Sequence, residues 1–390
     1  MIYVHVPFCR SFCTYCDFYS EVAARCRRAE EEREQEGLFG RFAESLAREV
    51  SCRAEEITDD VNTLYIGGGT PSVLPLDVFI RLLSALKDAG HGGPYDEFTV
   101  EVNPEDIVEK GPLYVEGLLK LGANRISMGI QSFDDGILKF MNRRHDSGTA
   151  VKAYRILEDA GVENISIDLI FGLPQLSDDL WRETLDKALD ISSRGIAPRH
   201  ISSYQISVEP GSMLAKLVEK GVWSEASEEL CQKQYAMLCG TLASEGYHHY
   251  EISNFALPGY EAKHNSAYWR HVPYVGLGPG AHSYIVSDDG SMHRRQWNEP
   301  DLQGYMKAAS EGSFAGQQGS ELLDKEQLDM EKVMLGLRTS AGLPESVLKS
   351  CCSERTVDRA LLSGDLVSAS QIRIPEERFF VSDTIISNLF

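Results

Sequence analysis

The order of apolar and polar positions predicts strands that alternate with helices over the first half of the chain. Short runs rich in Val, Ile and aromatic residues predict strands, and apolar residues three or four positions apart predict helices. The predicted strands are Ile2–Val6, Thr63–Ile66, Glu97–Val102, Arg125–Gln131, Asn164–Phe171 and His200–Val208. The predicted helices are residues 38–55, 75–88, 112–121, 134–141, 148–160 and 178–192. The charged run at 26–37 is interpreted as a solvated helix or loop.

Six β/α units predict an α/β fold in which a parallel sheet carries helices on its outside. Six units are too few for an eight-stranded barrel, so a partial, open barrel and a doubly wound sheet both fit. Such sheets bind ligands at the C-terminal ends of their strands. Polar residues stand at those ends and are expected to converge on one rim: Gly67–Thr70, Glu101, Asn103, Gln131 and Asp168.

The alternation stops near residue 213, which divides the chain into three predicted domains. Residues 1–213 form the parallel α/β part. Residues 214–320 are mixed, with a helix near 229–244 and the aromatic stretch 247–269. Residues 321–390 are mostly helical, and the terminal RFFVSDTIISNL is interpreted as a β-hairpin arm followed by a helix.

Composition narrows the class of protein and of partner. The chain has 390 residues with 38 Lys and Arg against 59 Asp and Glu, a net charge of −21. This acidic balance argues against nucleic acid or an anionic membrane as main partner. No apolar run is long enough to span a bilayer, and the N-terminus lacks the basic flank of a targeting segment. The nine cysteines are odd in number and clustered at one end, which suits a reducing compartment, the cytoplasm.

Cys9, Cys13 and Cys16 form a C-x3-C-x2-C array directly after the first strand. Three thiolates so close together can wrap one metal centre. Zinc prefers four ligands, and no fourth Cys or His follows at finger spacing. A complete iron–sulfur cluster also takes four cysteines, but Phe18 stands where a fourth would come. A cubane cluster held by three thiolates would leave one iron open to another ligand. The alternatives are a structural zinc with a distant fourth ligand, and three reduced thiols on a turn.

The sequence GGGTPS at 67–72 follows the second strand. Consecutive glycines permit positive φ angles and close approach of the backbone to a ligand. Without its context, the same sequence also fits a tight strand–helix turn.

The cysteine array resembles that of the radical S-adenosylmethionine (SAM) enzymes. Within them, YVHVPFCRSFCTYCDF is similar to the opening of the oxygen-independent coproporphyrinogen III oxidase family, which includes a heme-chaperone branch. Similar blocks run from Ile2 to about Thr339, among them GGGTPS, EVNPE, SMGIQSF, NISIDLIFGLP, YEISNFA, HNSAYW and GLGPGAHSY. The resemblance implies a partial (β/α)6 radical SAM barrel, a [4Fe–4S] cluster whose open iron chelates SAM, and a small, winged-helix-like C-terminal domain. Ser382 and Asp383 replace the glycine common after the hairpin of that domain.

The resemblance also implies the residues of each site. Cys9, Cys13 and Cys16 would hold the cluster. The SAM residues would be Tyr3, Gly68, Gly69, Thr70, Glu101, Gln131, Arg143 and Asp168. Tyr3 would lie near the sulfonium, Asp168 would bond the ribose hydroxyls, and Arg143 would meet a carboxylate. The NRRH sequence around Arg143 departs from the usual GR-x-H pattern of the family.

Two features indicate the heme-chaperone branch. Phe18 stands where decarboxylating oxidases usually carry a further Cys, and HNSAYW matches an HN-x-x-YW motif associated with heme binding. His264, Tyr268 and Trp269 would then contact heme, although a histidine among aromatic residues is often structural. His282 is a second candidate, near SAM. That only Met1 precedes the first strand also favours this branch.

The sequence is therefore interpreted as a heme chaperone that binds heme, a [4Fe–4S] cluster and SAM, and delivers heme to acceptor hemoproteins. An electron donor for the cluster and a homodimer are expected partners. The alternative is an oxygen-independent coproporphyrinogen III oxidase, which converts propionates to vinyls by hydrogen abstraction and loss of CO2. Radical SAM chemistry on an unrelated substrate is a third interpretation, and productive cleavage of SAM is left open.

Overall fold

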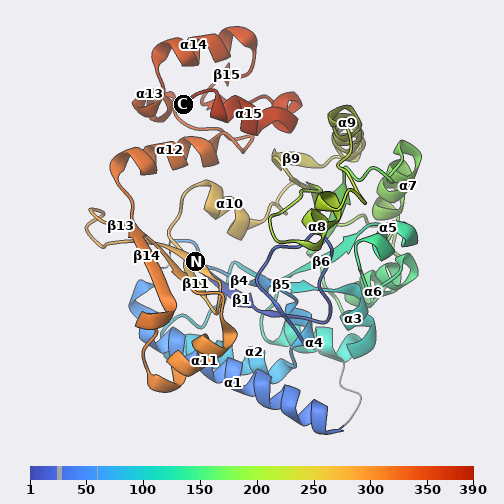
Figure 1. The fold of residues 1–390 in the computed structure, drawn as a ribbon, viewed down its shortest axis with the longest axis vertical. Helices are drawn as coiled ribbons and strands as arrows, with labels where there is room; N and C mark the ends of the chain where they lie inside the picture. Colours follow the sequence, from blue (N-terminus) through green and yellow to red (C-terminus); the bar gives the residue numbers. More distant parts are fainter. Residues whose placement is uncertain (24–28, 59) are drawn as a thin grey trace.

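A nine-stranded sheet curves through the centre of the molecule (Figure 1). The computed structural model describes residues 1–23, 29–58 and 60–390. Positions 26–28 of the predicted charged run, Cys26 among them, therefore lie outside the described residues. Six strands of the sheet are parallel neighbours: β1 (Ile2–Val6), β4 (Thr63–Gly68), β5 (Glu97–Val102), β6 (Arg125–Gln131), β7 (Ile165–Phe171) and β8 (His200–Gln205). The predicted partial barrel of six β/α units is therefore confirmed.

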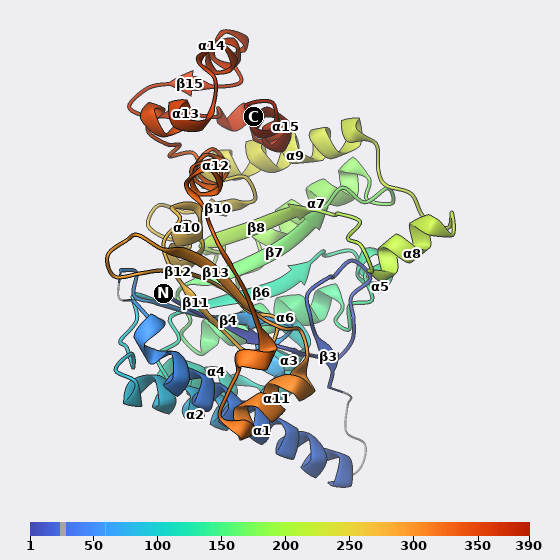
Figure 2. The same cartoon turned by 60° about the vertical axis from the view of Figure 1, so that its left-hand side comes forward.

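Helices surround the outer face of these strands (Figures 1 and 2). They are α1 (Ala29–Arg53), α2 (Leu76–Asp88), α3 (Pro104–Lys110), α4 (Pro112–Lys120), α5 (Asp135–Phe140), α6 (Ser147–Asp159) and α7 (Asp178–Leu189). The sequence pattern predicted all of them except α3. That short helix begins at Pro104, the proline position favoured in a first turn, and its two acidic residues there suit the positive end of the helix.

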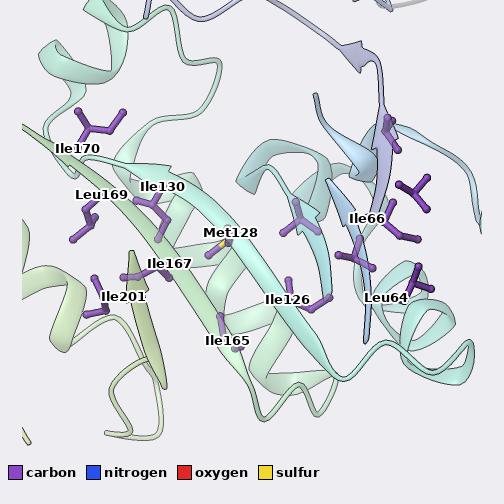
Figure 3. Close-up of a cluster of buried hydrophobic side chains, with 14 of the residues drawn as sticks. Leu64, Ile66, Ile126, Met128, Ile130, Ile165, Ile167, Leu169, Ile170 and Ile201 are labelled. Carbon is purple, nitrogen blue, oxygen red and sulfur yellow. The ribbon is translucent and has the colours of Figure 1, made fainter. Parts of the chain in front are cut away.

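Alternation along the strands separates an apolar outer face from a polar interior. Ile126, Met128, Ile165 and Ile167 are fully buried on the outer, helix-covered face (Figure 3). The intervening positions point inward and carry Ser127 of β6, Asp168 of β7 and their counterparts on the other strands. Strands buried on both faces usually read as continuous apolar runs, so polar side chains inside this barrel require hydrogen bonds or a ligand.

Residues 214–320 do not form a separate body, because they extend the barrel sheet at both edges. The strand β11 (Val275–Leu277) pairs in parallel with β1. At the other edge, β10 (Asn254–Ala256) pairs antiparallel with β8 and with β9 (His248–Glu251). This region also contains α8 (Met213–Glu219), α9 (Glu228–Ser244), α10 (Lys263–Trp269), β12 (His282–Val286), β13 (His293–Asn298), α11 (Leu302–Glu311) and β14 (Gln318–Leu322). The predicted boundary at 213 is therefore not a break in the sheet.

The C-terminal segment is mostly helical and lies at the top of Figure 1, where Thr339 forms a β-bridge with Glu251 at the end of β9. It contains α12 (Lys325–Gly336), α13 (Glu345–Cys351), α14 (Glu354–Ser363), the hairpin β15–β16 (Val367–Ser368 and Ile372–Arg373) and α15 (Ser382–Ser387). The prediction that RFFV forms a hairpin arm is wrong, because Glu376–Val381 is a 3-10 turn. Phe379 packs against His249, and Phe380 packs against Tyr235. In a strand these two consecutive side chains would point to opposite faces, whereas in the 3-10 turn both can pack inward. Among the described residues, no helix combines the length and the apolar character that a bilayer crossing requires.

Candidate functional site

A cavity of about 610 Å3 lies at the C-terminal ends of the parallel strands. Its wall combines the cysteine loop with the strand ends, as expected from the convergence of polar residues there. Ten predicted site residues line it: Cys9, Cys13, Cys16, Gly68, Gly69, Thr70, Glu101, Gln131, Arg143 and Asp168. Tyr3, His264, Tyr268 and Trp269 are not part of this lining.

The three cysteines sit on a loop that is closed at its base by a two-stranded ladder. In this ladder β2 (Phe8–Cys9) pairs with β3 (Glu21–Val22), and the loop between them carries Cys13 and Cys16. All three are half-buried free thiols. Burial raises the pKa of Cys9, and it raises the pKa of Cys16 to about 12. A metal must therefore displace these protons on binding.

Three thiols are the donor type that an iron–sulfur cluster takes. No group of three His, Cys, Asp or Glu side chains closes around one ion position in the part of the chain that the structure describes. A cubane accepts each thiolate at a separate iron corner. The loop thus offers, on one cavity wall, the three thiols that would hold a [4Fe–4S] cluster.

The glycine motif holds the cysteine loop against the barrel. The amide of Gly69 donates to the carbonyl of Val6, and the amide of Thr70 donates to that of Phe8. A Cβ on Gly69 would lie 2.7 Å from both of these carbonyl oxygens. Only glycine therefore allows the end of β4 to lie this close to the backbone that leads into Cys9.

Gly69→Ala is expected to lower both thermal stability and iron content after anaerobic reconstitution, because two backbone carbonyls must move and carry Cys9 with them. The matched control is Gly40→Ala, which places its Cβ in open space on α1. That control should keep full iron content and gain a few tenths of a kcal/mol to about 1 kcal/mol of stability. Full iron loading of Gly69→Ala would contradict the structural role given to this glycine.

A polar network joins two of the thiols to the strand ends. One terminal nitrogen of Arg143 lies 3.5 Å from the Cys13 sulfur, and the other donates to Asn103 Oδ1 at 2.7 Å. Asn103 in turn donates to the Thr70 hydroxyl, which lies 3.5 Å from the Cys9 sulfur. Arg143 thus places positive charge beside the thiols. Asn103, noted in the sequence only as a strand-end residue, is the link between Arg143 and Thr70.

Gln131 adopts an uncommon backbone conformation for a residue with a side chain. Its φ is 70°, and the pairing of β6 with β7 shifts register between Gly129 and Gln131. A left-handed residue of this kind costs free energy and persists where the surrounding structure or function requires it. Gln131 lines the cavity, at the rim where the strand ends were expected to converge, and its contact with SAM stays a prediction.

Two buried carboxyl groups face the cavity. Glu101 accepts hydrogen bonds from the Tyr65 hydroxyl at 2.6 Å and from the Gly68 amide at 3.0 Å. Asp168 accepts from Ser127 at 3.4 Å. Burial raises the pKa of Glu101 to about 7 and that of Asp168 to about 6, and the hydrogen bonds oppose the rise. Both groups can therefore exchange a proton near neutral pH.

Tyr3 lies inside the barrel, behind the cavity wall. Its hydroxyl hydrogen-bonds to Nδ1 of His5 at 3.0 Å, and Nε2 of His5 hydrogen-bonds to the Tyr19 carbonyl at 2.8 Å. This chain of contacts ties the first strand to the end of the cysteine loop. His282, the other histidine considered for the SAM site, is exposed, stacks near Trp297 and does not line the cavity.

The HNSAYW residues lie at the opposite end of the barrel strands. The backbone amides of Lys263 and His264 donate to Glu97, the first residue of β5. Nδ1 of His264 hydrogen-bonds to Thr63 at 2.9 Å, and Nε2 to the Tyr268 hydroxyl at 3.1 Å. Burial lowers the pKa of His264 to about 3. In this conformation His264 has no ring nitrogen free for a heme iron, whereas the buried Trp269 Nε1 has no hydrogen-bond partner.

The six-stranded open barrel with a three-cysteine loop at its rim defines a radical SAM protein. The Radical SAM superfamily profile matches residues 3–188. The structure superposes on coproporphyrinogen III oxidase HemN from Escherichia coli, a radical SAM enzyme, with a TM-score of 0.79. That match covers 100% of this chain and 89% of the other at 20% identity, so it establishes the fold alone.

Curated relatives then give the family. The heme chaperone HemW of Synechocystis is 33% identical over 89% of this chain and 80% of its own length. HemW of Bacillus subtilis is 32% identical over 87% of this chain and 84% of its own length. The mitochondrial radical S-adenosyl methionine domain-containing protein 1 of zebrafish, Danio rerio, is 30% identical over 88% of this chain and 73% of its own length. The chain belongs to the HemW family of radical SAM proteins.

Proposed function

We propose that this protein binds heme and passes it to acceptor hemoproteins. The observation that carries the proposal is Phe18, which is 63% exposed and lines the cavity at the position where a further cysteine would stand in a decarboxylating oxidase. Phe12 and Tyr204 line the same cavity and are 55% and 43% exposed. Large aromatic rings left in solvent at a cavity mouth offer faces on which a porphyrin can pack.

The same proposal includes two cofactors. Cys9, Cys13 and Cys16 would hold a [4Fe–4S] cluster, with Arg143 balancing part of its negative charge. Glu101, Gln131 and Asp168 would bind SAM on the neighbouring strand ends. When bound, the reduced cluster supplies the electron for radical cleavage of SAM, and the protein's part is to hold the two together and exclude water. A cytoplasmic location, an electron donor for the cluster and a homodimer belong to this proposal.

The alternative function is the conversion of coproporphyrinogen III propionates to vinyl groups. One assay separates the two. Anaerobically reconstituted protein, reductant, SAM and coproporphyrinogen III are incubated, and protoporphyrinogen and 5′-deoxyadenosine are measured by mass. We expect no porphyrin product beside an active control oxidase, together with stoichiometric heme binding at the Soret band. Product formation would establish the oxidase, and absence of heme binding would overturn the chaperone.

The contribution of His264, Tyr268 and Trp269 to heme binding stays a prediction, and the geometry defines its test. His264→Ala removes two buried hydrogen bonds, each worth about 1 kcal/mol, and should lower the melting temperature. Both ring nitrogens are already bonded, so His264 can ligate a heme iron only by giving up one of these bonds. If it keeps them, the Soret maximum and the heme stoichiometry stay unchanged. Tyr268→Phe, which removes only one of the bonds, is the control. A shifted Soret maximum in His264→Ala alone would identify His264 as an iron ligand.

A further inference from the structure

Arg10, the residue after Cys9, joins the cysteine loop to helix α3. Its Nε lies 3.0 Å from Oδ1 of Asp106, and its Nη1 lies 3.1 Å from Oε2 of Glu109. The two carboxylates differ in burial, because the Asp106 side chain is 2% exposed and that of Glu109 is 46% exposed. Arg10 and Asp106 both line the cavity, so their ion pair is part of the cavity wall.

Asp106 is also held from the side of the glycine motif. It accepts a hydrogen bond at 2.7 Å from the hydroxyl of Ser72, a fully buried residue. The Ser72 oxygen in turn accepts from the backbone amide of Asn103 at 3.0 Å. The Asn103 side chain donates to the Thr70 hydroxyl, which donates to the Cys9 sulfur at 3.5 Å. These contacts form a closed ring that begins at the residue after Cys9 and returns to the Cys9 sulfur.

The backbone around Cys9 explains why this anchor matters. The Cys9 carbonyl accepts from the Ala23 amide at 2.7 Å, and the pairing of β2 with β3 ends at these two residues. Beyond them, the Arg10 side chain attaches the loop to α3, and the Phe12 carbonyl accepts from the Asn142 side chain at 2.7 Å. Arg10 therefore holds the loop where strand pairing stops, one residue from the first thiol.

The burial of Asp106 decides which partner of Arg10 contributes most. An exposed ion pair contributes little, because water and salt screen it and long side chains lose entropy in forming it. A buried carboxylate that loses its cation is left with an uncompensated charge, so breaking such a pair is costly. The structure therefore assigns the anchoring of the loop to the pair of Arg10 with Asp106, and a minor part to Glu109.

We propose that Arg10 and Asp106 are positioning residues of the metal centre, and that their ion pair holds the Cys9 thiol at the cavity wall before metal binds. The two residues act through Cys9 and do not bind the metal themselves. The inference deepens the proposed function, because it rests on Cys9 as a ligand of the [4Fe–4S] cluster. The ion pair does not depend on the cluster, so its effect on Cys9 can be measured in the metal-free protein.

The first measurement is the rate at which iodoacetamide alkylates each cysteine of the metal-free protein, followed by peptide mass spectrometry. In Arg10→Gln and in Asp106→Asn, the freed Cys9 thiol should react about fivefold or more faster than in wild type. Two other cysteines serve as internal controls. Cys231 is buried and reports loss of the whole fold, whereas Cys52 is exposed and reports the reagent. Both should keep their wild-type rates.

The second measurement is the rate at which the reconstituted cluster loses iron to a chelator. Arg10→Gln and Asp106→Asn should each lose iron about fivefold or more faster, and the double variant should match the single ones, because the two residues act as a pair. Arg10→Lys keeps the charge and should restore slow loss in part. Glu109→Gln is the matched control, since it removes the exposed partner of the same arginine, and it should behave as wild type.

The outcomes separate positioning from a general structural role. If Cys231 accelerates as much as Cys9, the variants merely loosen the fold, and the proposal is overturned. Wild-type rates of Cys9 alkylation in Arg10→Gln and Asp106→Asn would also overturn it, as would an effect of Glu109→Gln equal to that of Asp106→Asn. The alkylation result stays valid if wild type assembles no cluster, so failure of the proposed cofactor is distinguishable from failure of the ion pair to hold Cys9.

Discussion

Replacing any one of Cys9, Cys13 and Cys16 by alanine is expected to abolish cluster assembly. The three thiols are the ligands that the loop offers to the cavity, so each variant leaves two thiolates where a site-differentiated cubane needs three. Iron after anaerobic reconstitution should fall from about four per chain to less than about one, with parallel loss of acid-labile sulfide and visible absorbance.

The control for the cysteine series is Cys52→Ala, because Cys52 is an exposed free thiol on α1. This variant should keep full iron and sulfide content, which separates cluster ligation from non-specific iron uptake by thiols. A single loop variant that still assembled a complete cluster would show that a different residue supplies the missing ligand, and the assignment of the loop would fail.

Glu101→Gln is expected to weaken SAM binding by roughly ten- to a hundredfold, the range for a hydrogen bond to a charged group. The side chain keeps its size and can still accept from Tyr65, but it no longer attracts the cationic ligand. Equilibrium binding of SAM to reconstituted protein measures this loss. Glu105→Gln, a cavity-lining carboxylate that is ion-paired to Arg144, is the comparison and should have a smaller effect.

The affinity for SAM should also depend on pH. Burial raises the pKa of Glu101 to about 7 and that of Asp168 to about 6, so both carboxyls ionise across the neutral range. Ionised carboxylates attract the ammonium and sulfonium of SAM, and affinity should therefore rise as the pH increases through these two values. In Glu101→Gln the affinity should rise only as the pH passes about 6, the pKa of Asp168. A flat profile in wild type would contradict the role of these carboxyls.

The stability of the protein without SAM should change with pH in the opposite direction and fall as the pH rises. A carboxyl whose pKa is raised by folding binds its proton more tightly in the folded state than in the unfolded state. The stabilisation is full below the unfolded value, here 4.5 for Glu101, and is lost as the pH rises through the folded value of about 7. Thermal unfolding of ligand-free wild type and Glu101→Gln across this window measures the difference, which should favour the variant increasingly as pH rises.

The barrel strands could be predicted well because alternation and β-branched residues are features of neighbouring positions in the sequence. Ile2–Val6, Glu97–Val102 and Arg125–Gln131 begin and end where the alternation and β-branched residues indicate. The pairing of β11 with β1 joins residues more than 270 positions apart, and no local pattern encodes it. The strand-like RFFV segment forms a 3-10 turn because its two phenylalanines pack against barrel residues, a tertiary effect that overrides local preference.

The cavity was predictable for a similar reason. Parallel strands bring their C-terminal ends to one rim, so Glu101, Gln131 and Asp168 could be placed together from the strand assignments alone. Tyr65 was missed because an inward polar residue looks like a surface residue in one sequence. The available signal was its alternation with buried Leu and Ile on a strand expected to be covered on both sides. HNSAYW illustrates the converse, since its residues carry a recognisable motif yet lie away from the cavity.

The position of β1 constrains the order in which the molecule can be built. This strand leads directly into the cysteine loop, and it is flanked by β4 on one side and by β11 on the other. Its partners Val275, Gly276 and Leu277 are among the later parts of the 390-residue chain to leave the ribosome. Residues 2–4 thus gain this second strand partner only after residue 277 has been made. The residues that line the cavity all lie between Cys9 and Glu209. A nascent chain arrested before residue 275 would therefore already contain the whole wall around the three thiols, while the strand that leads into their loop stayed unpaired along one edge.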